Sequence, residues 1–151
     1  MNLTIDRQIR RFRGFLIFSG LFNIFLAAPL MVPELYGRYL AMFWMLNENL
    51  GLGGVAPVMP FSPVGALLVN TAGIDLVLIG FIVLYAAQDP LSRRVIPALN
   101  AAGRTLFSCV ILYYAIVYDI PRIILLIGGI DLMISGVFAY FLYSLRKLQS
   151  Y

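Results

Sequence analysis

The sequence contains no histidine and a single cysteine, Cys109, among its 151 residues. Without histidine, the chain offers no imidazole to a haem, to a histidine-containing zinc site or to histidine-dependent catalysis. One cysteine allows neither an intrachain disulfide nor a Cys-x-x-Cys redox pair. We therefore expect no metal site, no cofactor and no enzymatic activity from this chain.

Charge is also scarce, because only 12% of the residues are Asp, Glu, Lys or Arg. The net charge of +4 is of the sign that nucleic-acid-binding proteins carry. However, the basic residues cluster at the ends of apolar segments and form no patch interleaved with aromatic side chains. This distribution is typical of membrane proteins and argues against nucleic acid as a partner.

Apolar side chains are abundant: they make up 62% of the chain, and the mean hydropathy is +0.91. Soluble domains contain about 45–50% apolar residues. An apolar run of about 18 residues or more predicts a transmembrane helix. Four runs qualify, at residues 14–32, 64–87, 95–117 and 123–145. The prediction is one all-α domain, residues 1–151, folded as an integral membrane four-helix bundle.

The first run, residues 14–32, follows basic residues and has a second interpretation as a cleaved signal peptide. Ala27-Ala28-Pro29 is a poor cleavage site, and the apolar run continues past it. We therefore expect this run to remain as a membrane span.

Lys and Arg in short loops predict the orientation of the spans. With four spans, one side of the membrane carries Arg7, Arg10, Arg11, Arg13, Arg93, Arg94, Arg146 and Lys147. The other side carries only Arg38 and Arg122. Both termini are therefore predicted to be cytoplasmic.

The long connection between the first two spans contains apolar residues at helical spacing over residues 34–50. These residues are Leu35, Tyr39, Met42, Phe43 and Leu46. They predict a short amphipathic helix in the first extracytoplasmic loop, which lies on the outer surface or caps the bundle. Trp44 fits a membrane-interface anchor. The helix either packs over the bundle or covers a ligand.

The second and fourth apolar runs share a motif, Gly-Ile-Asp-Leu followed by a second glycine. The motif glycines are Gly73 and Gly80 in one run and Gly129 and Gly136 in the other. Glycines seven residues apart share a helix face and allow close helix packing. The chain is either a duplicated two-helix hairpin or shows chance similarity between two packing faces.

Three charged residues, Asp75, Arg104 and Asp131, lie near the middle of apolar runs. At 1.5 Å per residue, they lie about 18, 14 and 21 Å from the cytoplasmic ends of their helices. Arg104 can therefore reach Asp75, Asp131 or both. Asn23 and Asn100 complete the predicted intramembrane polar core.

Two interpretations of this core remain open. Either the core fixes the packing of the helices, or one of its two Asp side chains exchanges a proton. The second interpretation follows because two carboxylates at one site raise the pKa of one of them. The first predicts a non-enzymatic membrane subunit or interaction protein with lipids and other subunits as partners, or a homo-oligomer. The second predicts a small oligomeric transporter or proton-coupled carrier. A third alternative is a subunit that binds a lipid or quinone in the polar core.

Several short motifs resemble a known family. They are Ala86-Ala87-Gln88-Asp89-Pro90 after the second run, Gly103-Arg104 in the third and Asp131 in the fourth. The pattern resembles small bacterial four-helix membrane proteins of the DoxX-like kind. The resemblance implies an inner-membrane bundle, which in some relatives is a small subunit of a quinone-linked oxidoreductase complex. This chain has no redox ligand of its own, so it would contribute a scaffolding or quinone-facing surface.

Overall fold

The computed structural model describes residues 3–149, and these residues form helices and connecting loops without a strand. The helices in chain order are α1 (Leu3–Ala27), the 3-10 helix η1 (Ala28–Met31), α2 (Tyr36–Asn49), α3 (Pro63–Ala86), α4 (Val95–Tyr118) and α5 (Ile123–Gln149). The predicted all-α helical bundle is confirmed.

Four of these helices are long and apolar enough to cross a membrane: α1 with η1, α3, α4 and α5. The chain is therefore a multi-pass membrane protein. The bounds of α3 and α4 differ from the predicted spans by one residue or less at each end. Helix α1 begins well before residue 14, because the basic segment that precedes the apolar run continues the same helix.

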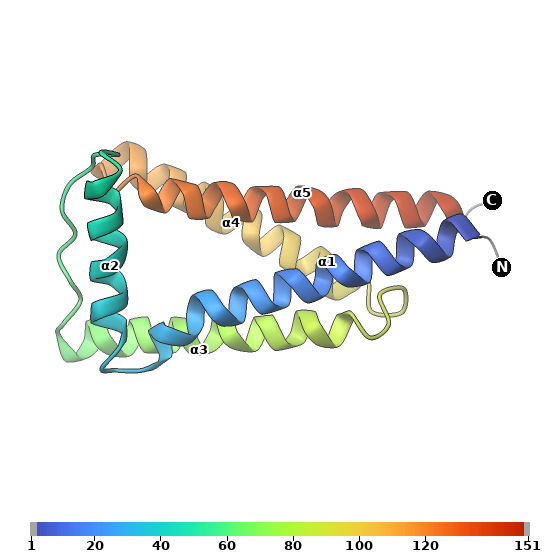
Figure 1. The fold of residues 1–151 in the computed structure, drawn as a ribbon, viewed down its shortest axis with the longest axis horizontal. Helices are drawn as coiled ribbons and strands as arrows, with labels where there is room; N and C mark the ends of the chain where they lie inside the picture. The colour runs from blue at the N-terminus through green and yellow to red at the C-terminus, as the bar shows by residue number, and fades with distance from the viewer. Residues whose placement is uncertain (1–2, 150–151) are drawn as a thin grey trace.

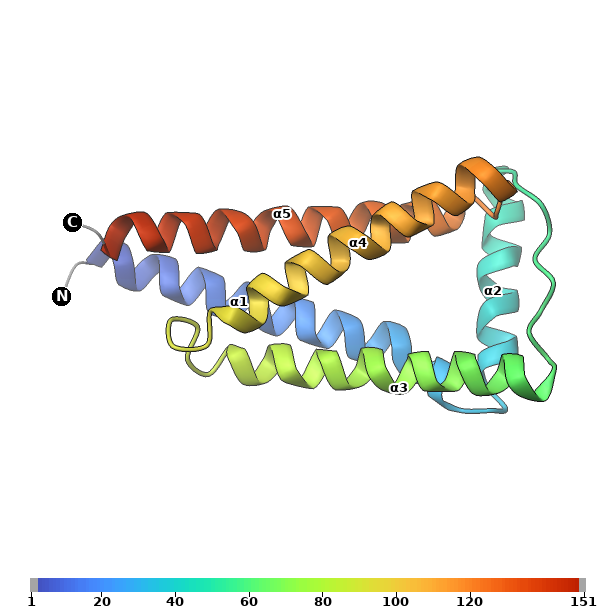
Figure 2. The ribbon, with the colours of Figure 1, turned by 180° about the vertical axis from the view of Figure 1, so that it is seen from behind.

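The four long helices form two closely packed pairs, α1 with α3 and α4 with α5. Figures 1 and 2 show that the pairs lie together at the end that holds both chain termini and diverge toward the other end. Helix α2 lies crosswise to the long helices at the diverged end (Figure 1). We call the end with the termini the closed end and the end with α2 the open end.

Aromatic and aliphatic side chains fill the closed end. Phe12 and Phe138 are fully buried, and the Phe12 ring stacks on Phe141 with a centroid distance of 5.2 Å. The Ser144 hydroxyl donates a hydrogen bond of 2.9 Å to Gln8 Oε1, which joins α5 to α1. Close packing of these large side chains, together with this hydrogen bond, holds the two helix pairs together here.

The α1–α3 pair depends on glycines, as the shared motif predicts. A Cβ added at Gly80 would lie 2.8 Å from the Gly20 carbonyl oxygen, and one at Gly73 would lie 2.8 Å from the backbone of Leu30. No side chain fits at either contact without movement of the backbone. Gly73 and Gly80 therefore allow α3 to approach α1 and η1 closely.

The second copy of the motif is used differently, and its predicted packing role is wrong. Gly129 and Gly136 are exposed, and an added Cβ at either would meet no atom within 4 Å. Residues two positions apart lie about 200° apart around a helix. Because α5 turns Asp131 inward, Gly129 faces outward, whereas α3 turns Gly73 inward and Asp75 outward.

The predicted amphipathic helix is α2, and polar side chains attach it to the bundle. The Tyr39 hydroxyl donates a 2.8 Å hydrogen bond to the Leu26 carbonyl, and the Tyr36 hydroxyl donates one of 3.1 Å to the Pro60 carbonyl. Burial raises the pKa of the Tyr39 hydroxyl above its ordinary value. The two hydrogen bonds fix helix α2 across the open end.

Candidate functional site

Arg104, on α4, lies at the centre of a buried polar cluster and is only 7% exposed. Its Nε donates to Asn100 Oδ1 at 2.9 Å, and its Nη2 donates to Asn23 Oδ1 and to Ser19 Oγ. Its Nη1 donates to Asp131 Oδ1, with which it forms an ion pair. Three helices, α1, α4 and α5, thus contribute to one cluster, which we call the Arg104 cluster.

The Arg104 cluster contains four of the five residues predicted for the polar core. Asn23, Asn100, Arg104 and Asp131 are in contact, and Asp75 lies outside the cluster. Asp75 is on the exposed face of α3, and within residues 3–149 it has no hydrogen-bond or ion-pair partner. The prediction that the core includes Asp75 is wrong, because the packing of the α3 glycines on α1 turns this side chain outward.

Hydroxyl side chains join α4 to α5 on either side of Arg104. The Ser135 hydroxyl donates a 2.8 Å hydrogen bond to the Ala101 carbonyl, and the Ser108 hydroxyl lies 2.8 Å from the Gly128 carbonyl oxygen. Ser135 was missed from the sequence, although it follows Asp131 by one helical turn on the same face. Interhelical hydrogen bonds of this kind stabilise membrane bundles.

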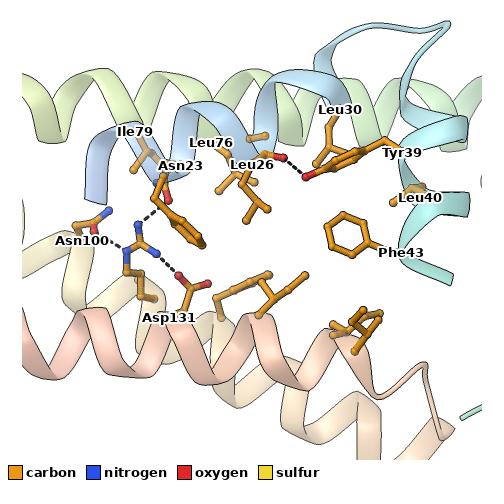
Figure 3. A pocket seen from close by; sticks show the side chains of 18 of the residues that line it. Asn23, Leu26, Leu30, Tyr39, Leu40, Phe43, Leu76, Ile79, Asn100 and Asp131 are labelled. Atoms are coloured by element: carbon orange, nitrogen blue, oxygen red, sulfur yellow. Dashed lines mark hydrogen bonds and ion pairs between the residues drawn. The ribbon is translucent and has the colours of Figure 1, made fainter. Parts of the chain in front are cut away.

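A cavity of about 690 Å³ lies between the two helix pairs, bounded by the Arg104 cluster and by α2. Its walls are largely apolar and include Leu26, Leu76, Ile79, Phe107 and Ile127. Figure 3 shows Asn23, Asn100 and Asp131 together at one end of this cavity and Tyr39, Leu40 and Phe43 at the other.

Helix α2 forms one wall of the cavity. Tyr39, Phe43 and Trp44 line it, together with the segment 57–60 of the following loop. The sequence predicted Trp44 as a membrane-interface anchor and not as a residue that lines a cavity. The sequence showed that α2 has an apolar face but not that the helix pairs diverge beneath it.

The polar end of the cavity retains unused hydrogen-bonding capacity. A guanidinium has five N–H groups, and Arg104 donates four hydrogen bonds within residues 3–149, which leaves one N–H on Nη1. Asn23 and Asn100 accept these bonds through their amide oxygens, and their amide nitrogens donate no hydrogen bond to a group within residues 3–149. Because Arg104 and Asp131 neutralise each other, the site offers hydrogen-bond donors without a net charge.

The part of the chain that the structure describes contains no group of three His, Cys, Asp or Glu side chains that could hold a metal ion. Comparisons with protein-family models, with curated proteins and with solved structures found no match to this chain.

Proposed function

We propose that this multi-pass membrane protein binds a lipid-soluble molecule that has an apolar body and a neutral polar head. The observation that carries the proposal is the cavity of about 690 Å³, which has apolar walls and a polar end formed by the Arg104 cluster. Small-molecule sites commonly have volumes of about 300–1,000 Å³ and a few convergent polar groups on apolar walls. The cavity matches both criteria.

The electrostatics of the cluster favour a neutral head over a phosphate. Asp131 already compensates the Arg104 charge, and an anion would have to displace this carboxylate or lie beside it. A carbonyl or hydroxyl oxygen, in contrast, can accept hydrogen bonds from the free amide groups of Asn23 and Asn100. A quinone, a sterol-like alcohol or a neutral lipid has such an oxygen on an apolar body.

The geometry gives less support to the transporter alternative. That hypothesis requires Asp75 and Asp131 to share Arg104, but Asp75 is exposed on α3 and outside the cluster. The Arg104 cluster has balanced charges and lacks the excess carboxylate that proton exchange through this site requires. Ligand binding needs neither feature.

The wider role in this proposal is that of a non-enzymatic accessory subunit in a bacterial inner membrane, with both termini cytoplasmic. Lys and Arg are in excess on the side of the membrane where both chain termini lie, and this excess supports the orientation. The location and the membership of a DoxX-like family are supported by the sequence resemblance. A bound lipid-soluble molecule is compatible with a quinone-linked complex, in which this chain supplies a binding surface.

Filling the cavity tests the proposal. Gly103 lines the cavity, and an added Cβ there meets no atom within 4 Å, so Gly103→Leu is expected to occupy ligand space without a clash. Gly129→Leu is the matched control, since Gly129 is also unobstructed and lies outside the cavity. Each protein is purified in mild detergent, and its copurifying lipid-soluble molecules are quantified by mass spectrometry per mole of protein.

The expected result is a neutral-headed molecule that copurifies with the original chain and with Gly129→Leu and is lost from Gly103→Leu. Equal amounts on all three proteins, or bulk phospholipid alone, would contradict the proposal. Circular dichroism establishes that both variants are folded.

A further inference from the structure

Asp75 lies at mid-depth in α3 with its side chain on the outside of the bundle. Helix α3 spans Pro63–Ala86, so Asp75 is about 18 Å from one end and about 16 Å from the other. The residue is exposed, and no described residue pairs with it. A single chain therefore presents an uncompensated carboxylate to the hydrocarbon interior of a membrane.

Such a position is unfavourable for aspartate in particular. Charged residues in spans normally face the bundle interior or pair with another group. Lys and Arg have long side chains that extend to the membrane surface, but aspartate has a single methylene group and remains at the depth of its backbone. A cation outside this chain would remove this cost if it lay beside Asp75 at mid-depth.

A second copy of this chain offers no suitable cation. Arg104 is the only Lys or Arg inside the four predicted apolar runs, and the others flank these runs. Arg104 itself is buried and paired with Asp131. A cation at this depth would therefore belong to a different membrane protein.

The surface around Asp75 fits a packed helix. Thr71 and Ala72, one turn earlier on the same face, are exposed and small, and small residues let helices approach closely. Leu68 and Leu78 flank them and are 66% and 55% exposed. This stripe lies away from Gly73 and Gly80, which are already covered by α1 and η1.

We propose that this face of α3 binds a transmembrane helix of a partner protein that carries a Lys or Arg at mid-membrane depth. The basic side chain pairs with Asp75, and the partner helix packs on the stripe formed by Leu68, Thr71, Ala72 and Leu78. This interface is independent of the cavity and of any ligand in it.

The test uses the full chain, donor-labelled at its N-terminus, in phosphatidylcholine vesicles. The probes are two acceptor-labelled polyleucine transmembrane helices, one with a central lysine and one with leucine at that position. Energy transfer as a function of probe density gives the strength of association. The lysine probe is expected to bind about tenfold more strongly than the leucine probe, as for one polar contact between membrane helices.

Asp75→Leu is expected to abolish this preference, and Asp75→Asn to reduce it. Both variants remove a charge from the lipid-facing surface without removing a contact in the structure, so both should fold. Met133→Leu, at a 73% exposed position on α5, is the control and should retain the preference. Three outcomes would overturn the proposal: equal binding of both probes, a preference that survives Asp75→Leu, or Asp75-dependent association between two copies of the chain.

Discussion

Asn47 and Ile123 connect α2 to the start of α5. Asn47 Oδ1 accepts a 2.9 Å hydrogen bond from the Ile123 backbone N–H, and Asn47 Nδ2 donates one of 2.9 Å to the Gly53 carbonyl. The first N–H groups of a helix lack intrahelical partners, so Asn47 satisfies one of them from another element. With an exposed fraction of 1%, Asn47 is fixed at this junction.

Asn47→Ala is expected to destabilise the protein by about 1–3 kcal/mol, because it leaves the buried Ile123 N–H without its partner. It also removes one of the two hydrogen bonds to the Gly53 carbonyl, which keeps the bond from the Arg122 N–H. The measurement is unfolding in mixed micelles of increasing SDS fraction, followed by Trp44 fluorescence and circular dichroism. Asn49→Ala, at an exposed position of the same helix, is the control and should have little effect. Equal stabilities of the two variants would show that the α2–α5 connection contributes nothing measurable.

The Arg104–Asp131 pair gives a prediction about buried charge. Asp131→Leu leaves the guanidinium without its counter-charge and is expected to cost about 3–5 kcal/mol and to lower accumulation in the membrane. Arg104→Leu with Asp131→Leu removes both charges and should recover most of this loss. Membrane levels and SDS-induced unfolding check both expectations. A double variant no more stable than Asp131→Leu would contradict them.

Asp89, in the turn between α3 and α4, gives a prediction about pH. Hydrogen bonds from Ser92, including a 3.2 Å bond from its backbone N–H, hold the pKa of the Asp89 carboxyl below its usual value of 3.8. A lowered native pKa means that the ionised form stabilises the turn above pH 3.8, and that this stabilisation is lost as the pH falls through the native pKa. The protection of the Ser92 amide, which is its exchange rate relative to that of an unstructured peptide at the same pH, should therefore fall in that acidic range. Asp89→Ala should remove this pH-dependent change in protection, whereas an unchanged fall in protection in this variant would contradict the assignment.

The spans were predictable because hydropathy and helix length directly reflect the thickness of a membrane. Helix α2 was also predictable, since its apolar residues recur at helical spacing. The divergence of the helix pairs was not, because it depends on how glycine contacts at one interface and bulky side chains at another set the distances between helices. The cavity, and with it the position of Trp44, follows from that divergence.

Part of the site was predictable for a similar reason. Asn23, Asn100 and Asp131 were identified because polar residues at mid-depth in apolar helices need hydrogen-bond or charge partners inside the bundle. The error over Asp75 arose from the rotation of α3 about its axis. The hydrophobicity pattern does not determine this rotation, because α3 is apolar on all its faces. The close contact of Gly80 with α1 determines it.

The two copies of the shared motif should respond differently to the same substitution. Gly80→Ala is expected to destabilise the protein by about 1–3 kcal/mol, because the new methyl group would meet the Gly20 carbonyl oxygen and force the helices apart. Gly136→Ala meets no atom and should be neutral or stabilising by up to about 1 kcal/mol, since alanine favours helix over glycine. SDS-induced unfolding of the two variants measures both effects. Equal destabilisation would show that Gly136 also lies at a helix contact, and that the two hairpins pack more alike than the structure indicates.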